Sequence, residues 1–586
     1  MMEKFWEWEE EKLNAKLDVD FKDMERPIKI RQQKYIKWYK LYRGIINPED
    51  MRDNGANLFI NYTMPTIDTL VSRVLQTLFR QRPYVVIDPK QKQFAENAKY
   101  MQSLVEDQLD NKVNVVEKWY SLLLEVFLYG TSLPYTDWKL EKKAVKQWID
   151  YKIPGTNITI ARVPKKKELR VYDAPIYEIT DIFNVYVPSS AKDIKDADGM
   201  AIKNYITPAE LKKRAEMGIY KNIEDLSEEN NPFEEIEKIR QEEQGTSDTV
   251  SQKRIKLITF YYDDRIITQA NGKKIIRNEE NPLFSMEKPF DRVMWHPLPN
   301  EFWGMSLADA VESLQLELNT TRNQRIDNVS LVLNKLFGYK KDADINPHEI
   351  YSKAGHGIPM TDKNDVWEFP VTDVTGSAYQ EEAMIKQDIQ YITFVNDYAM
   401  GRTTPGTADE TATAVRNKTE ASNVNFNTVM MMLNATGLKP MYDKFIKLNM
   451  QYMDKPENVP VDTPKGTEST EVTRQMITGD YGLKSANPNF ELPASKEVKR
   501  QDLGYLFDSF TKNPTAAQYI NVPAFMKKMF ALYDISDSDE LLVQQPDPGE
   551  NPDMSVDQTN PQITGDLGLS NEQIPQEAGV EQNGFS

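Results

Sequence analysis

The chain has 586 residues, 40% of them apolar, which is enough for two or more modules that each bury a core. It has no Cys and three His, which excludes disulfide frameworks, Cys-ligated zinc and thiol catalysis and argues against a His-rich metal centre. The formal charge of −18 argues against static binding of nucleic acid through a basic surface, but it does not exclude DNA that passes by.

The chain is expected to be soluble and made in the cytoplasm, without membrane contact. Residues 1–12 are aromatic and acidic and lack the positive leader and apolar core of a secretory signal. The most apolar stretch, 115–135, is interrupted by Glu117, Lys118 and Glu125 and cannot span a bilayer as it stands.

Four helices are predicted near the start of the chain. The first, 27–44, is basic and aromatic, and it either packs its rings inward while its lysines extend into solvent, or contacts nucleic acid directly. The second, 64–80, ends before Pro83, because proline disfavours helix in the residue before it. Two more follow at 93–111 and 113–129, the last with Gly130 as its C-cap.

Beyond these helices, apolar and polar residues alternate. Segments 168–172 and 183–187 are predicted strands. The stretch 222–248 is acidic and poor in apolar residues, which favours a mobile insertion. Runs 256–262 and 274–277 flank Asn271-Gly272, a strong signal of a tight hairpin. We therefore predict an α+β, mainly helical chain in which helices are followed by a small sheet.

Three long helices are predicted between residues 299 and 454, each opened by a pair of residues that resembles a capping box. The pairs are Ser306 with Asp309, Ser377 with Gln380, and Thr407 with Glu410. The first helix, 307–336, has too little apolar surface for a globular core. We expect neighbours on its flanks and one wet face, although an ordinary surface helix would give the same pattern.

The third of these helices is predicted to be kinked. Its apolar seam runs from Ala412 to Leu433 and resumes from Leu438 to Tyr452, with Gly437 and Pro440 at the join. A compact insertion rich in Pro and Gly, 338–375, separates the first two helices. From Leu541 onward the composition predicts disorder.

The motifs of common enzymes are absent from the sequence. It contains neither GxxxxGK[ST] nor a Gly-x-Ser-x-Gly elbow. Asp193, Asp196 and Asp198 resemble part of a calcium loop whose register fails, so a solvated turn is the alternative. Asp263-Asp264 could serve a metal-dependent nuclease, but no third carboxylate follows at a readable spacing. We expect no enzyme, no metal and no cofactor.

A series of short motifs gives the most specific information. They are WYKLYRG at 38–44, NYTMP at 61–65, GTS at 130–132, DIFNVYVP at 181–188, FWGMSLAD at 302–309, LQLELN at 314–319, GRT at 401–403 and TATAV at 411–415. In this order, and over residues 25–540, the chain resembles the portal (head-to-tail connector) proteins of tailed bacteriophages. The stretch beginning at Phe302 is the most specific of them.

The resemblance implies a closed ring, typically of twelve subunits, at one vertex of the capsid. The portal fold is divided into wing, stem, clip and crown. The implied division is a wing at 1–300, a first stem helix at 301–337, a clip at 338–376, a second stem helix at 377–400, a tunnel loop with a long kinked helix and the return to the wing at 401–494, crown helices at 495–540 and a disordered tail at 541–586.

The implied function is a conduit for DNA packaging and ejection in the virion, assembled in the host cytoplasm. The implied partners are further copies of the chain, double-stranded DNA in the channel, the terminase large subunit, head–tail adaptor and tail proteins, and the major capsid and scaffolding proteins. The alternatives are another phage structural protein, such as an internal scaffold or a tail component, and a carboxylate nuclease.

The resemblance also suggests site residues. Candidates for the channel wall are Asn319, Arg322, Asn323, Arg325, Lys335, Arg402, Thr403 and Thr404. For Arg322, Arg325 and Lys335, a structural ion pair is an equal alternative. Candidates for partner docking on the clip are Lys340, Lys341, Asp342, His348 and His356. We expect an acidic subunit without a strong basic patch, which suits DNA that slides rather than DNA that is held.

Overall fold

The computed structural model describes residues 5–53, 55–80, 82–152, 159–224, 226, 234–245, 254–342, 345–346, 348, 350, 357, 359–395, 425–463, 466–485, 503–508, 525–526 and 529–530. The chain forms two compact units, 1–495 and 496–586. The described residues of the second unit are helical, and Phe507 stacks on Phe525 with ring centroids 5.3 Å apart. The predicted tail, 541–586, lies outside the described residues.

The first long helix begins earlier than its sequence pattern predicts. α1 runs from Glu10–Arg43 and contains Pro27, whereas a start at Pro27 was expected, which is wrong. Leu13, Leu17, Phe21, Met24 and Ile28 are buried at helical spacing, so the apolar face continues upstream of the proline. Gly44 ends the helix in the left-handed conformation, with φ 73°.

The aromatic rings of α1 pack inward. Tyr35, Trp38 and Tyr42 are buried in the main core, and Tyr35 contacts the rings of Tyr129 and Phe183 at centroid distances of 5.1 and 5.6 Å. Of the two interpretations of this segment, the packing one is therefore confirmed for these rings.

A layer of helices surrounds the buried Trp119. It consists of α2 (Thr63–Phe79), α3 (Ala95–Asp107), α4 (Val115–Tyr129) and α10 (Lys439–Tyr452). The helix expected at 93–111 continues from α3 into a π-helical turn at Gln108–Val113. Gly130 ends α4 with φ 86°, as predicted.

Small sheets complete the first unit. The largest has the order β4-β5-β6-β7-β8, with β4 (Val185–Tyr186), β5 (Met200–Ile206), β6 (Ile255–Tyr261), β7 (Arg265–Ala270) and β8 (Lys274–Glu280). A second has the order β3-β2-β9, with β2 (Thr131–Lys152), β3 (Thr159–Thr180) and β9 (Val293–Met294). Two pairs are β1 (Val85–Pro89) with β14 (Tyr481–Ser485) and β12 (Glu457–Thr463) with β13 (Gly466–Val472).

The predicted strands are confirmed in part. Asn271 and Gly272 have φ values of 50° and 67° and form a tight turn, but the turn joins β8 to β7 rather than to β6. The segment expected as a strand at 183–187 starts as a 3-10 turn, Ile182–Asn184, before β4.

The acidic stretch 222–248 contains a helix, so the expectation of a mobile insertion is wrong for residues 234–245. α6 (Glu235–Glu243) buries Ile236 in the main core, and Arg240 pairs with Asp181 at 2.7 Å. A short helix that precedes this stretch, α5 (Pro208–Glu216), packs Leu211 against residues of β5, β6, β7 and β8.

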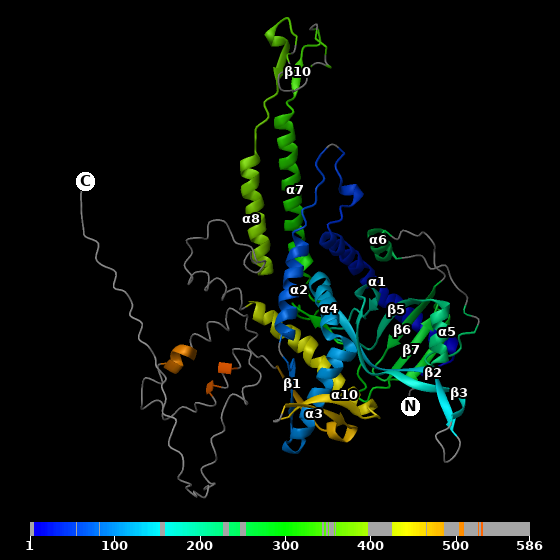
Figure 1. Cartoon of the computed structure of the whole chain (residues 1–586). Coiled ribbons are helices and arrows are strands. Elements are labelled where there is room, and N and C mark those ends of the chain that lie inside the picture. The colour runs from blue at the N-terminus through cyan, green and yellow to red at the C-terminus, as the bar shows by residue number, and fades with distance from the viewer. Residues whose placement is uncertain are drawn as a thin grey trace, which may run out of the picture. The chain divides into compact units, whose positions relative to one another are not determined.

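Two long helices lie side by side and project from the body of the first unit (Figure 1). α7 (Leu307–Leu333) is capped by Ser306, whose side chain accepts from the Asp309 N–H, as predicted. α8 (Thr375–Thr393) starts ahead of the expected cap, and Ser377 lies inside its first turn, so that cap is wrong. The third expected cap, Thr407 with Glu410, lies outside the described residues. Between α7 and α8 stand β10 (Phe337–Tyr339) and β11 (Val366–Glu368), which pair antiparallel.

The join at which the kink is predicted contains a π-helical turn. Residues 425–433 are helical, a π turn follows at Asn434–Leu438, and α10 continues the helix. Pro440 has no N–H to donate, and Gly437 has no side chain that would strike Trp119. Among the described residues, none of the helices is both long and apolar enough to cross a membrane.

Two carboxylates lie in the core of this unit, Glu106 buried and Glu125 partly buried. Glu125 accepts from Ser132 Oγ and, at 3.0 Å, from the Ile182 N–H. Burial raises the pKa of Glu125 to about 8, against the lowering effect of the Ser132 hydrogen bond. Burial likewise raises the pKa of Glu106 to about 7, although Tyr442 donates to this carboxylate.

Candidate functional site

The base of the α7–α8 hairpin is tied to the end of α4 by two glycines. A Cβ on Gly130 would collide with the carbonyl of Gly304. The Gly304 N–H donates to Thr131 Oγ1 at 2.8 Å, and Ser306 Oγ donates to the Leu128 carbonyl at 2.6 Å. The GTS and FWGMSLAD motifs, far apart in sequence, therefore meet where α7 leaves the core.

Apolar packing joins α7 and α8 near their base. Val311 and Leu318 of α7 pack with Ile385 and Ile389 of α8, and Tyr62 closes this cluster. Over residues 311–318 of α7 and 385–389 of α8, the apolar face of each helix is buried in this cluster.

A buried ion triad joins the helices farther along. Glu382 is 3% exposed and accepts from Arg325 Nε at 2.9 Å and from Arg322 Nη2 at 2.8 Å. The Arg325 guanidinium also lies 4.0 Å from the centre of the Tyr379 ring. Because two cations share one carboxylate, both depend on Glu382 for compensation.

An extended segment, residues 56–62, lies along α7 and is called the strap here. Alternate N–H groups of the strap donate to side chains on one face of α7. The pairs are Ala56 with Asp327 at 2.7 Å, Leu58 with Asn323 at 2.9 Å, Ile60 with Asn319 at 3.0 Å and Tyr62 with Gln315 at 3.0 Å. The amides also donate in return, from Asn323 to Leu58 O and from Gln315 to Ile60 O.

The strap can pair with α7 at regular intervals because the rise of two extended residues is close to the rise of four helical residues. Four residues of α-helix rise about 6 Å, and two residues of extended chain rise about 6.6 Å. Side chains four apart on α7 can therefore each meet the next inward-facing N–H of an antiparallel segment. This spacing of Gln, Asn, Asn and Asp is visible in the sequence and could have revealed the strap, but these residues were taken for a wet face.

The described channel candidates all have partners within the chain. Asn319 and Asn323 hold the strap, Arg322 and Arg325 hold Glu382, and Lys335 pairs with Glu368 at 2.7 Å. A place on the channel wall stays a prediction for them. Arg402, Thr403 and Thr404 lie outside the described residues.

The tip of the hairpin carries the clip candidates. Lys340 pairs with Asp365 at 3.0 Å, while Lys341, Asp342 and His348 are exposed. His356 lies outside the described residues. Exposed apolar side chains surround β10 and β11, namely Leu336, Tyr339, Trp367 and Phe369. Gly338 lets the Trp367 indole lie directly on the opposite strand.

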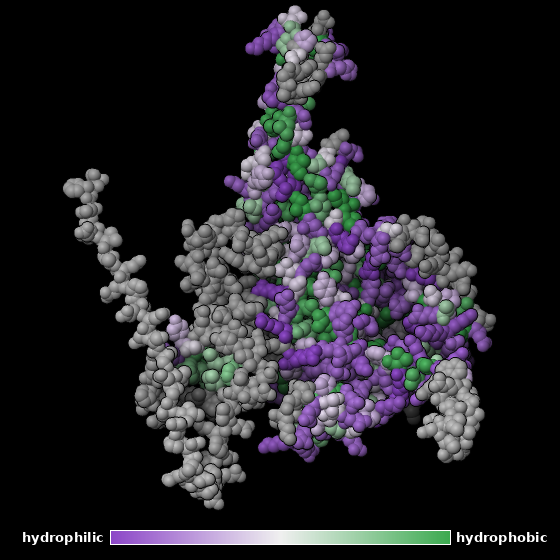
Figure 2. Space-filling view, in the orientation of Figure 1, coloured by the Kyte–Doolittle hydropathy of each residue, from purple (hydrophilic) through white to green (hydrophobic). Residues whose placement is uncertain are grey.

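Apolar side chains are also exposed along both helices (Figure 2). On α8, Met384 is 62% exposed and Tyr391 is 81% exposed, and on α7 Leu316, Leu331 and Leu333 are exposed. Such a run of apolar residues on a projecting element is typical of a protein–protein interface.

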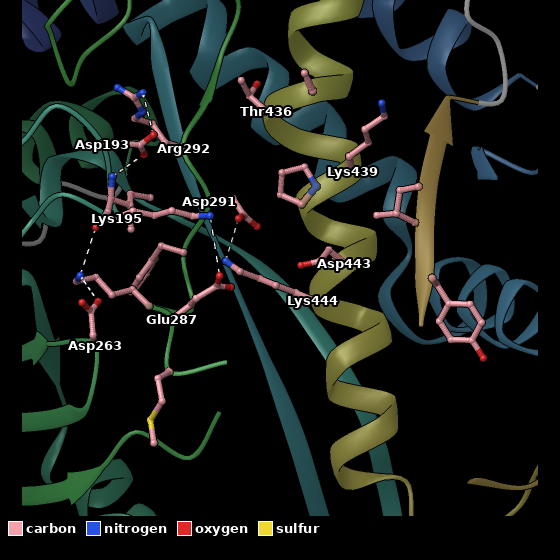
Figure 3. Close-up of a pocket in the computed structure, with 18 residues that line it drawn as sticks. Asp193, Lys195, Asp263, Glu287, Asp291, Arg292, Thr436, Lys439, Asp443 and Lys444 are labelled. Carbon is pink, nitrogen blue, oxygen red and sulfur yellow. Dashed lines mark hydrogen bonds and ion pairs between the residues drawn. The ribbon is translucent and has the colours of Figure 1, made fainter. Parts of the chain in front are cut away.

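A charged cavity of about 700 Å3 lies between loop 286–292 and α10 (Figure 3). Its carboxylates each have a Lys or Arg partner, as in Asp291 with Lys444 at 2.9 Å and Asp193 with Arg292 at 3.5 Å. Burial raises the pKa of Asp291, while Lys444 opposes this rise. The cavity is therefore lined by an ion-pair network.

The two acidic groups singled out in the sequence come together in space. Asp196, Asp198, Asp263 and Asp264 line one cavity with Asp20 and Asp23 of α1. Asp263 is already paired with Lys288 at 2.5 Å. Within the described part of the chain, no group of three Asp, Glu or His side chains is arranged to hold a metal ion.

Comparison with known proteins agrees with the motifs. A family model described as "Phage SU10 portal protein" matches residues 150–573, which is more than half of the chain. No curated protein matches the chain. With this match, the ordered motifs and the mixed helix and sheet architecture, the chain belongs to the family of phage portal proteins.

Proposed function

We propose that this chain forms a closed ring, of about twelve copies as the resemblance implies, whose channel carries double-stranded DNA during packaging and ejection. In this proposal the ring sits at one vertex of the capsid of the virion after assembly in the host cytoplasm. The chain catalyses no reaction, and ATP hydrolysis is supplied by the terminase. Its membership of the phage portal family supports this role.

The α7–α8 hairpin carries the proposal. It projects from the body with exposed apolar side chains on both helices. In water such side chains favour burial against another surface. Figure 1 draws α8 on one flank of α7 and the loop that leads into the strap on the other. Two unlike flanks suit a heterologous contact, which closes into a ring when repeated about an axis.

The proposed division of the chain follows the resemblance. Residues 1–300 form the wing, 301–337 and 377–400 the stem, 338–376 the clip, 401–494 the tunnel loop and kinked helix, and 495–540 the crown. In the stem, Arg322 and Lys335 keep partly exposed cationic groups that are the most accessible to phosphates. In the tunnel loop, Arg402, Thr403 and Thr404 are the corresponding candidates.

The clip is proposed to dock the terminase large subunit and later the head–tail adaptor and tail proteins. Trp367 and Phe369 present apolar anchors there, with Lys341, Asp342 and His348 beside them as polar contacts. The capsid and scaffolding proteins are proposed to contact the wing during assembly.

Ring formation tests the proposal. Negative-stain microscopy and mass photometry of the purified protein should show rings with a central hole. Replacing Met384 and Tyr391 by Lys should shift the mass to the monomer, while Gln387→Lys, which adds charge to the same helix without removing an apolar side chain, should leave the rings intact. A monodisperse wild-type monomer under many conditions would contradict the proposal.

Two alternatives predict different results. A scaffold or tail component would give filaments or irregular oligomers, and deletion of residues 338–376 would leave terminase binding unchanged. A carboxylate nuclease built on Asp263-Asp264 would degrade DNA in the presence of magnesium or manganese, whereas the proposed conduit leaves it intact.

A further inference from the structure

The hairpin of β2 and β3 concentrates positive charge. Residues 139–170 contain ten Lys or Arg and three Asp or Glu, a net charge of +7 in a chain of total charge −18. The described outer parts of the two strands, residues 139–146 and 164–170, are called the basic finger here. In the linear sequence its lysines fall into two separate runs, so the expectation of no strong basic patch is wrong once the strands pair.

Cross-strand pairing places like charges opposite each other. Lys142 faces Arg170, and Lys146 faces Lys166. Directly opposed Cβ atoms lie about 4.5–5.5 Å apart, where like charges destabilise a sheet. Arg170 is compensated by Asp173 at 2.5 Å and Asp454 at 2.7 Å. Lys146 and Lys166 have no such partner among the described residues.

The other face of the finger is also basic. Lys143, Lys165 and Lys167 lie there, alternating with exposed Val145 and Leu169. The finger has seven lysines, of which Lys139 pairs with Glu141 at 3.3 Å. The other six are exposed, and none of them forms an ion pair with another described residue. The hairpin thus keeps a repulsion that an anionic partner would relieve.

We propose that the basic finger binds duplex DNA through its phosphates, at a place outside the channel proposed above. The eight residues 139–146 span about 26 Å, along which a duplex carries one negative charge per about 1.7 Å of its axis. Lysines are flexible point charges, so they can follow phosphates without a fixed register. The hairpin runs out from the body away from α7 and α8 (Figure 1), and the side chains of residues 142–146 and 164–169 are exposed on both of its faces.

DNA fits the finger better than an acidic protein surface does. Protein interfaces are depleted in Lys and depend on buried aromatic anchors. Residues 139–146 and 164–170 contain no aromatic residue, and they carry lysines on both faces. Phosphate contacts of this kind give affinity without sequence specificity.

The test uses closed circular duplex DNA, which has no end to enter a ring and so reports contacts outside the channel. Binding of the full chain is measured by a mobility shift between 50 and 200 mM salt. Each phosphate contact adds about 0.9 to the slope of log affinity against log salt, so with three to four contacts the wild-type affinity should fall roughly 40- to 150-fold over this range. Replacing by Gln the six finger lysines that lack an ion pair, all but Lys139, should lower the logarithmic salt slope by about three.

Two matched variants complete the experiment. Lys142, Lys146 and Lys166 changed to Gln should give an intermediate loss, because one face remains basic. Lys99, Lys212 and Lys213 changed to Gln, which are exposed lysines outside the finger, should bind as the wild type does. Intact rings in electron micrographs and an unchanged melting temperature establish that each variant folds.

Two outcomes overturn the inference. The first is a wild-type protein that does not bind circular DNA at 50 mM salt, which would favour an acidic protein as the partner of the finger. The second is an equal loss of affinity in the six-lysine variant and in the control variant. Either outcome leaves ring formation and the proposed channel untouched, because those are read from particle images and mass.

Discussion

The ion triad of the α7–α8 hairpin allows the sharpest stability prediction. Glu382→Gln leaves the guanidinium of Arg325, which is also buried, and that of Arg322 without their carboxylate. Removing one partner of a buried ion pair costs about 3–5 kcal/mol. Since Arg322 is partly exposed and can recover water, the lower end applies, and about 3 kcal/mol corresponds to roughly a hundredfold change in an opening equilibrium.

Hydrogen–deuterium exchange of the α8 amides measures this opening directly. Exchange should be faster by about a hundredfold in Glu382→Gln and unchanged in Glu381→Gln, which alters an exposed neighbour on the same helix. Glu382→Leu combined with Arg325→Met should restore slow exchange, because an apolar pair of similar volume needs no compensation. Equal exchange in the Glu382 and Glu381 variants would refute the reasoning.

Three further predictions concern the strap, a glycine and a partly buried carboxylate. Gln315→Leu should lower the free energy that holds the strap on α7 by about 1–3 kcal/mol, because it leaves the N–H groups of Tyr62 and Thr63 unpaired. Protease should then cleave the strap faster, whereas Gln324→Leu, at an exposed position, should leave cleavage unchanged. Gly130→Ala should lower the melting temperature well beyond Gly218→Ala, since both have positive φ but only the first Cβ collides with backbone. The pKa of Glu125 in the folded state, about 8, lies above its value in the unfolded state, so between these two values only the native state keeps the proton. The free energy of unfolding of the wild type should therefore fall as the pH rises from about 5 to 8. In denaturant titrations, Glu125→Gln should reduce this dependence on pH.

Local signals in the sequence predicted much of the helical framework. Gly130, Gly44 and Ser306 act at the ends of helices through their own backbone or side chain, so their roles can be read without knowing the tertiary structure. The start of α1 was missed because Pro27 was taken as a boundary, while the buried residues that continue the helix upstream lie on an acidic, polar segment.

The candidate site was less predictable because its contacts are distant in sequence. Asn319 was expected to face solvent or DNA, and Arg325 either to contact phosphate or to form a structural ion pair. The partners of these two residues lie 259 and 57 residues away in the chain. The basic finger was missed for a related reason, since Lys146 and Lys166 become neighbours only once β2 and β3 pair in register. The spacing of residues along one helix or strand does not show which side chains of a second element will contact it.

The ladder between α7 and the strap has a mechanical consequence. Four side chains share the attachment, and each hydrogen bond contributes about 0.5–1.5 kcal/mol net, so the loss of one rung leaves the others to hold. Within the strap, Asn61 donates to the carbonyl of Tyr42 at 2.6 Å, which extends the attachment to the end of α1. A torque applied at the tip of the hairpin would therefore be transmitted to α1 and α2 as well as to the N-terminal end of α7.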